Sequence, residues 1–262
     1  MTGLVLRSDE AAIATLTLSN PEKLNALSMA MLEALGAELE RLRGDRSIRA
    51  VILCGAGRAF CAGHDLRELS AARQAEDAGR GFYEALFKRC SEVMLAITRL
   101  PQPVIAEVRG IATAAGCQLV ATCDMAVAAE TARFGVNGVN IGLFCSTPMV
   151  ALTRNVPAKF AFEMLTTGEF ISAARAAEIG LVNRSVPEAG LAAATRELAG
   201  RIAGKLAAAV RIGKEAFYAQ AALPLAEAYA YAGAVMTENM LRDDTAEGVA
   251  AFIDKREPSW RQ

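Results

Sequence analysis

Two turns rich in small residues are the parts of this chain best suited to chemistry. The first spans residues 58–65 (RAFCAGHD) and the second spans residues 110–118 (GIATAAGCQ). Each follows a short apolar run, residues 50–54 and residues 104–108, that predicts a strand, and each leads into a helical pattern. Two such corners on neighbouring strands can aim two backbone N–H groups at one point. The pair would stabilise a negative oxygen, either an enolate or a tetrahedral oxyanion derived from a thioester, without a charged side chain.

Small residues at strand–helix corners are also ordinary connections, because glycine permits a positive φ and alanine permits close packing. The order and separation of the two turns are more specific than either turn alone. Together they resemble the oxyanion corners A-G-x-D-[LI] and G-x-x-x-G-G-G of the crotonase (enoyl-CoA hydratase/isomerase) superfamily. The resemblance covers nearly the whole chain and includes residues 20–27, 123–128, 167–173, 180–183 and 247–258.

This resemblance implies an α/β crotonase (ClpP/crotonase-like) fold, built from repeated ββα units with a C-terminal helical trimerisation region. It divides the chain into a crotonase core over residues 1–187, which is an acyl-CoA-binding spiral α/β domain, and a helical oligomerisation region over residues 188–262. The implied partners are an acyl-CoA thioester and further copies of the chain, in a homotrimer or a dimer of trimers. No separate cofactor is expected, since coenzyme A is part of the substrate.

By the same resemblance, the backbone N–H groups of Ala62 and Ala115 form the oxyanion hole. Residues 63–66 would line the path of the pantetheine and adenine groups. Beside the two oxyanion residues, the predicted substrate-binding set comprises Gly63, His64, Asp65, Leu66 and Gly116.

Two catalytic carboxylates of the resembling hydratases are absent. Those enzymes carry one glutamate two residues after the last glycine of the second corner, where this chain has Gln118, and another four residues after Phe134, where it has Gly138. A glutamine amide can orient a water but cannot accept its proton, and glycine can do neither. Efficient two-glutamate hydration is therefore not expected, and double-bond isomerisation is disfavoured as well. Both segments resemble a branch of the superfamily that keeps the fold and the corners but lacks both glutamates.

His64 is the only histidine of the chain and lies inside the first corner. It could act as a general base or as a donor to the thioester or pantetheine. Alternatively, its side chain points away and bonds to the backbone of the loop. Asp65 is expected to cap a helix that begins at Leu66. Cys61, beside His64, could be a reactive thiol, although a packed thiol is the simpler prediction.

Three functions stay open from the residues. The chain could be an enzyme acting on a CoA ester by chemistry that needs little acid–base help, with a lyase or isomerase of fatty acid metabolism as the family expectation. It could be a non-catalytic pseudoenzyme that binds acyl-CoA. It could also be a weak enoyl-CoA hydratase in which Gln118, Asn137, Asn140 and ordered waters relay protons.

Amino-acid composition narrows the possible partners, metal sites and cellular compartment of the protein. The chain has 262 residues, 53% of them hydrophobic, and a formal net charge of −1, so nucleic acids and membranes are not expected partners. A single histidine argues against a histidine-based metal site, so no metal is predicted. Six cysteines without CxxC spacing indicate packed thiols in a reducing compartment. With no leader pattern near Met1, the predicted location is cytoplasmic.

Hydrophobic periodicity predicts the strands and helices around the corners. Residues 3–7 and 12–18 alternate as strands, and Ser28 is expected to cap a helix whose apolar stripe is Leu32, Leu35, Leu39 and Leu42. Helical crossovers between short apolar strands predict a largely parallel sheet. Further helices are predicted over residues 82–100, 189–204, 206–220, 223–241 and 244–255.

Overall fold

A six-stranded sheet forms the centre of the chain. The computed structural model describes residues 3–260, and its main sheet has the strand order β1-β2-β3-β5-β7-β10. All neighbours in this sheet are parallel except β1 and β2. The strands are β1 (Val5–Glu10), β2 (Ile13–Leu18), β3 (Ala50–Gly55), β5 (Val104–Val108), β7 (Met125–Ala129) and β10 (Arg184–Val186).

The largely parallel sheet predicted from the sequence is thus confirmed, with one shift at its edge. The first strand was expected over residues 3–7, and it runs instead from Val5 to Glu10. Its polar end pairs antiparallel with β2, from Val5 opposite Leu18 to Glu10 opposite Ile13. Because β1 is an edge strand, its backbone pairing with β2 extends the strand over residues that show no apolar alternation.

A second, smaller sheet has the order β4-β6-β8-β9. Its strands have only two or three residues each, too few for a periodic signal in the sequence. They are β4 (Ala59–Cys61), β6 (Ile111–Thr113), β8 (Arg133–Gly135) and β9 (Ile171–Ser172). The two predicted corners follow β4 and β6, so this small sheet and not the main one directly positions them.

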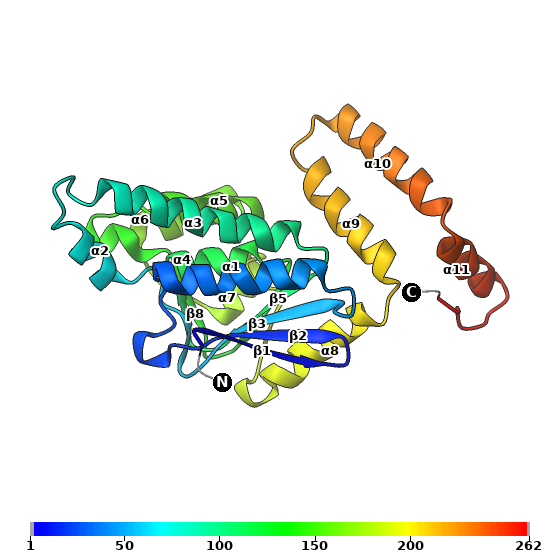
Figure 1. The fold of residues 1–262 in the computed structure, drawn as a ribbon, viewed down its shortest axis with the longest axis horizontal. Helices are drawn as coiled ribbons and strands as arrows, with labels where there is room; N and C mark the ends of the chain where they lie inside the picture. The colour runs from blue at the N-terminus through cyan, green and yellow to red at the C-terminus, as the bar shows by residue number, and fades with distance from the viewer. Residues whose placement is uncertain (1–2, 261–262) are drawn as a thin grey trace.

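Helices cover both faces of the main sheet (Figure 1). On one face the apolar stripe of α1 (Met29–Gly44) is buried, and α1 packs beside α3 (Arg80–Arg99). Ser28 caps α1 as predicted, its hydroxyl accepting from the Met31 N–H at 3.2 Å. The other helices before β10 are α2 (Leu66–Ala72), α4 (Ala115–Thr122), α5 (Ser146–Asn155), α6 (Ala158–Thr167) and α7 (Ala173–Glu178), and the 3₁₀ turns in this part of the chain are η1 (Pro21–Lys23) and η2 (Asn137–Ile141).

The opposite face of the main sheet is covered by α8 (Leu191–Ala203), which follows the 3₁₀ turn η3 (Glu188–Gly190). Leu191 and Ala199 of α8 are fully buried in a second apolar cluster with Ile52 and Ile105 of the sheet. The first helix of the predicted C-terminal region therefore packs on the core.

The last three helices form an arm that extends away from the sheets (Figure 1). They are α9 (Ala207–Gln220), α10 (Leu225–Met240) and α11 (Asp243–Ile253). Large apolar side chains on the arm are exposed, among them Leu225 and Tyr229 at 74% each and Phe252 at 86%. We call α9–α11 the arm from here on.

Polar side chains join the arm to the core. The ammonium of Lys214 on α9 donates to the carbonyls of Ile97 and Gln102 and to the Asp124 carboxylate, at 2.9, 3.0 and 2.7 Å. Tyr218, one turn later, donates to the other oxygen of Asp124 at 2.8 Å. Lys214 is 8% exposed, so this group, which we call the Lys214 anchor, is a buried ion pair with every donor satisfied.

Candidate functional site

The two predicted corners lie in contact. Strands β4 and β6 pair in parallel, with Cys61 opposite Ala112, so the turns that follow them emerge side by side. A Cβ built on Gly63 would lie 3.0 Å from Ala114 Cβ and 3.4 Å from the Ala115 nitrogen. Gly63 also has a φ of +89°, which a residue with a side chain rarely adopts. The close approach of the corners therefore depends on this glycine.

The second corner presents a free helix N-terminus. Helix α4 begins at Ala115, whose N–H has no intrahelical acceptor because it is the first helical residue. The preceding residue, Ala114, has φ 49° and ψ −119°, a strained backbone for a residue with a Cβ, and its own N–H donates to Gly135 at 2.9 Å. Gly116 follows with its backbone so close to Cys61 that a Cβ would collide with the Cys61 carbonyl.

At the first corner the structure corrects one of the two predicted oxyanion donors. The Ala62 N–H, expected in the oxyanion hole, donates to the Leu24 carbonyl at 3.0 Å. Its neighbour Gly63 accepts from the Leu27 N–H at 2.7 Å, whereas the N–H of His64 takes part in none of the backbone hydrogen bonds of the described chain. The free donor at this corner is therefore His64 N–H, two residues after Ala62. The sequence pattern located the loop but could not show which amide the loop itself uses.

Residues around the first corner hold it in place. Asp65 accepts from the Arg67 and Glu68 N–H groups, which confirms the predicted cap of α2 at Leu66, and it pairs with Lys23 at 2.9 Å. The hydrogen bond from Lys23 lowers the pKa of Asp65. Asn25, fully buried, donates to the Ala59 carbonyl of β4 at 2.8 Å. The sequence assigned Asn25 no role, because the burial that obliges its amide to find partners is visible only in the structure.

The His64 side chain bonds to the backbone of the loop at one nitrogen only. Nδ1 lies 3.0 Å from the Leu27 carbonyl oxygen, while Nε2 is buried and has no partner among the described residues. The imidazole stands edge-on to the ring of Phe87 on α3, with 5.6 Å between ring centroids. Burial lowers the pKa of His64, an effect that the Leu27 carbonyl partly opposes.

Gln118 lies inside the fold behind the second corner. It is 5% exposed, and its side-chain oxygen lies 4.0 Å from the Cys90 thiol sulfur of α3. Its own N–H donates to Ala114 at 3.0 Å as part of the first turn of α4. The amide thus stands at the first carboxylate position with only a weak thiol donor beside it.

Backbone atoms fill the space beside Gly138, the expected position of the second carboxylate. The hydroxyl of Thr113 donates to the Asn137 side chain at 2.6 Å, which ties η2 to the second corner. In η2, a Cβ built on Gly138 would collide with the Leu143 carbonyl oxygen and lie 2.8 Å from Cys145 Sγ. The space where a glutamate would begin is therefore already occupied. Asn140, offered above as a proton relay, donates to the Gly168 carbonyl at 3.3 Å.

All six cysteines are free, and five are buried. Burial raises the pKa of Cys61 and of Cys117 to about 12 each, so both thiols are protonated at neutral pH. Packed thiols were predicted, and the reactive alternative for Cys61 is wrong.

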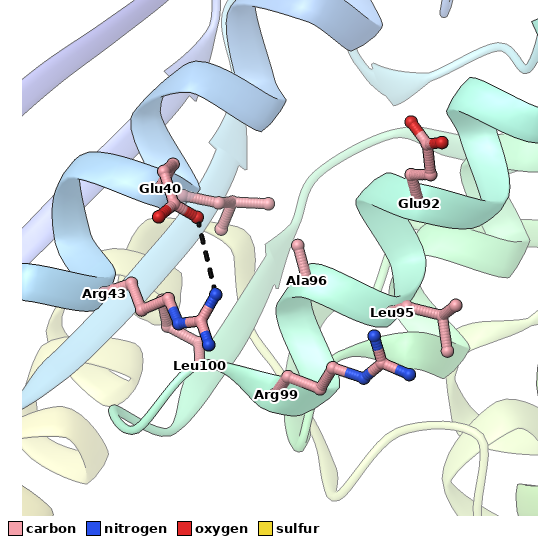
Figure 2. A pocket seen from close by; sticks show the side chains of 8 residues that line it. Glu40, Arg43, Glu92, Leu95, Ala96, Arg99 and Leu100 are labelled. Carbon is pink, nitrogen blue, oxygen red and sulfur yellow. Dashed lines mark ion pairs between the residues drawn. The ribbon is translucent and has the colours of Figure 1, made fainter.

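A separate cavity of about 190 Å³ opens between the C-terminal halves of α1 and α3 (Figure 2). None of the predicted site residues lines it, and its two arginines and two glutamates balance in charge, with Glu40 and Arg43 paired at 3.8 Å. We therefore place the candidate site at the corners. Within the described chain, no group of three His, Cys, Asp or Glu side chains is placed to hold a metal ion.

Paired strand–turn–helix corners on a spiral of sheets and helices define the crotonase fold, and the comparisons agree. Residues 8–262 match the family model described as enoyl-CoA hydratase/isomerase. This chain belongs to the enoyl-CoA hydratase/isomerase family.

Curated relatives from several vertebrates carry the name enoyl-CoA hydratase domain-containing protein 3, mitochondrial. The Xenopus laevis protein is 44% identical over 99% of this chain and 86% of its own length. The human protein is 46% identical over 95% of this chain and 80% of its own length. The superfamily branch indicated by the two segments without glutamates is thereby confirmed.

Two solved structures show the same fold. An enoyl-CoA hydratase of Mycobacterium smegmatis superimposes with a TM-score of 0.95 at 53% identity, covering 100% of both chains. Human enoyl coenzyme A hydratase domain-containing protein 3 gives a TM-score of 0.93 at 44% identity, covering 98% of this chain and 100% of the other.

The relatives also correct the predicted location. Because the curated vertebrate relatives are named mitochondrial, the cytoplasmic prediction is wrong by this comparison. The prediction was based on packed thiols and on the lack of a leader pattern near Met1, and packed thiols persist in any reducing compartment. None of the described helices is both long enough and apolar enough to span a membrane.

Proposed function

We propose that this chain binds an acyl-CoA thioester and holds the thioester carbonyl oxygen between the N–H groups of His64 and Ala115. The observation that supports this is the contact between the two corners, each with an unused amide. Two aligned N–H donors at a helix start stabilise a partly negative oxygen without a cofactor. Gly63, Asp65, Leu66 and Gly116 belong to the same two corners and would border the rest of the ligand.

The absent carboxylates limit the chemistry of this site. Gln118 cannot accept a proton, and the Leu143 carbonyl excludes a side chain at Gly138. Thioester binding therefore does not imply hydration. Two alternatives stay open: an enzyme that converts bound acyl-CoA by another reaction, and a pseudoenzyme that only binds it. Whether bound acyl-CoA is ever converted separates them.

Removal of one oxyanion donor tests the binding. Proline is tolerated at the first position of a helix, so Ala115→Pro deletes the N–H at a position where the helix does not need it. We expect affinity for butyryl-CoA to fall about tenfold, the effect of one hydrogen bond to a polarised oxygen. Isothermal titration calorimetry measures this loss.

The matched ligand is S-butyl-CoA, a thioether of the same length without a carbonyl. Its affinity should not respond to Ala115→Pro, because it has no oxygen for the donor. Equal losses for both ligands would show that Ala115 has only a structural role. Failure of the unmodified chain to bind butyryl-CoA at all would refute the proposed function.

We further propose that the arm assembles three copies, or two stacked trimers. Its exposed apolar side chains, such as Phe252 at 86% and Ile253 at 71%, are costly in a monomer and typical of an interface. Light scattering should give three or six times the 27.6 kDa of one chain. Replacing Phe252 and Ile253 together by serine should reduce that mass without unfolding the core. A monomer at micromolar concentration would contradict the assembly.

A further inference from the structure

The imidazole of His64 has a fixed tautomer. Nδ1 lies 3.0 Å from the Leu27 carbonyl oxygen, which can only accept, so Nδ1 carries the proton and Nε2 carries a lone pair. Nε2 is buried and has no hydrogen-bond partner within the described chain. Buried polar atoms without hydrogen-bond partners are rare in folded proteins, and each one requires an explanation.

The other ionisable side chains near the corners are engaged or protonated. The Glu68 carboxylate, which acts on His64 electrostatically, accepts from the Met29 N–H at 3.0 Å. The thiols of Cys61 and Cys117 are protonated, with pKa values of about 12. The Asp65 carboxylate is held by Lys23 and by the start of α2. Gln118 is a neutral amide. His64 alone combines a neutral ring, favoured by burial, with an unused lone pair.

The imidazole packs on the same helix, α3, as Gln118, the residue at the expected position of the first glutamate. Its ring contacts Phe87, and the Gln118 side chain contacts Cys90, which is one turn further along the same face of α3. The same residue supplies the amide proposed to hold the thioester oxygen. The imidazole and the N–H that would hold the carbonyl oxygen therefore belong to the same residue.

We propose that His64 is a catalytic base for hydrolysis of the bound acyl-CoA thioester, an inference that rests on the acyl-CoA binding proposed above. Ligand binding must bring a water between Nε2 and the carbonyl carbon. Nε2 takes a proton from this water as its oxygen bonds to the carbonyl carbon, and the C=O electron pair moves to the oxygen held by the two N–H groups. The C–S bond then breaks, and the leaving CoA thiolate is protonated by the imidazolium, giving a carboxylic acid and CoA.

One base is enough for this reaction. A thiol is a far stronger acid than an alcohol or an amine, so CoA leaves as a thiolate without a second acidic group. Hydration of a double bond, in contrast, needs both a proton acceptor and a proton donor. A corner pair with one imidazole base, and with its Asp65 carboxylate held by Lys23 and the start of α2, fits the first reaction and not the second.

The test compares hydrolysis with binding in the full-length chain. Butyryl-CoA and dodecanoyl-CoA are incubated in ¹⁸O-labelled water, and CoA and acid are quantified by mass spectrometry, which avoids thiol reagents that react with cysteines. We expect release at least about 10²-fold above the solution rate, with one labelled oxygen per acid. His64→Asn should lower release about 10²-fold, because asparagine can still donate to the Leu27 carbonyl but has no Nε2.

Affinity measured on the same samples separates the outcomes. Unchanged butyryl-CoA affinity in His64→Asn, with hydrolysis lost, supports a catalytic role, because a damaged corner would weaken binding as well. If the unmodified chain binds butyryl-CoA but releases no CoA above the solution rate, the hydrolysis inference is wrong and the binding proposal stands. If it does not bind, the binding proposal itself is wrong. Equal hydrolysis by the unmodified chain and His64→Asn would also overturn the role of His64.

Discussion

Purified protein should hydrate crotonyl-CoA at no more than about 10⁻⁴ of the rate of a hydratase with two glutamates. A positioned acid or base contributes on the order of 10²–10⁴ in rate, and this chain lacks both groups. Gln118 has no proton-accepting oxygen of suitable basicity, and Gly138 has no side chain. Loss of the crotonyl double-bond absorbance, followed beside a two-glutamate enzyme under identical conditions, measures the ratio. Turnover of tens per second would contradict the expectation.

Restoring one carboxylate provides the internal control. Gln118→Glu places a carboxyl where the amide now lies, and we expect a gain of about 10²-fold, the lower end of the range for one acid–base group. The site is 5% exposed at this residue, so desolvation will keep part of the carboxyl protonated.

The second glutamate cannot be restored in the same way. In Gly138→Glu the new Cβ meets the Leu143 carbonyl oxygen and Cys145 Sγ, so the loop over residues 138–145 has to move. We expect this variant to lose stability and to gain no hydration. A double variant as active as a two-glutamate hydratase would show that the loop yields and that only the two side chains separate this chain from hydratases.

The sequence predicted the elements that are long enough to be periodic. The stripe from Leu32 to Leu42 and the helices near residues 80–99 and 207–220 carry their own repeat, and the structure confirms them. The small sheet was not predicted, because strands such as Ala59–Cys61 exist only through pairing with partners far along the chain. Tertiary contacts, not local propensity, decide such strands.

The site was predicted to the level of the loop and not of the atom. Motif order predicted both corners, which the structure brings into contact, and it assigns Gln118 and Gly138 to the two carboxylate positions. It could not show that the Ala62 amide bonds to Leu24, which leaves His64 as the free donor, because that depends on where residues 20–27 fold back. Nor could it show that the Leu143 carbonyl, five residues away, fills the space beside Gly138.

Lys214→Met should destabilise the chain by about 3–5 kcal/mol, the usual result of removing one partner from a buried ion pair. Methionine has a similar length and is apolar, so the loss reports the missing donors more than a cavity. The Ile97 and Gln102 carbonyls lose their donor, and Asp124 keeps only Tyr218 and the Val104 N–H, which donates at 2.6 Å. Urea unfolding at one fixed protein concentration measures the change.

Lys205→Met is the matched control, because Lys205 is exposed and precedes the same helix. Its effect should stay within about 0.5 kcal/mol, as for most surface substitutions. Since the Lys214 anchor joins α9 to the core, its loss should also loosen the arm, and limited proteolysis near residues 204–206 should proceed faster in Lys214→Met than in Lys205→Met. Equal stability and equal cleavage of the two variants would mean that the arm is held by its apolar contacts, and that the buried ion pair contributes no more than the surface lysine does.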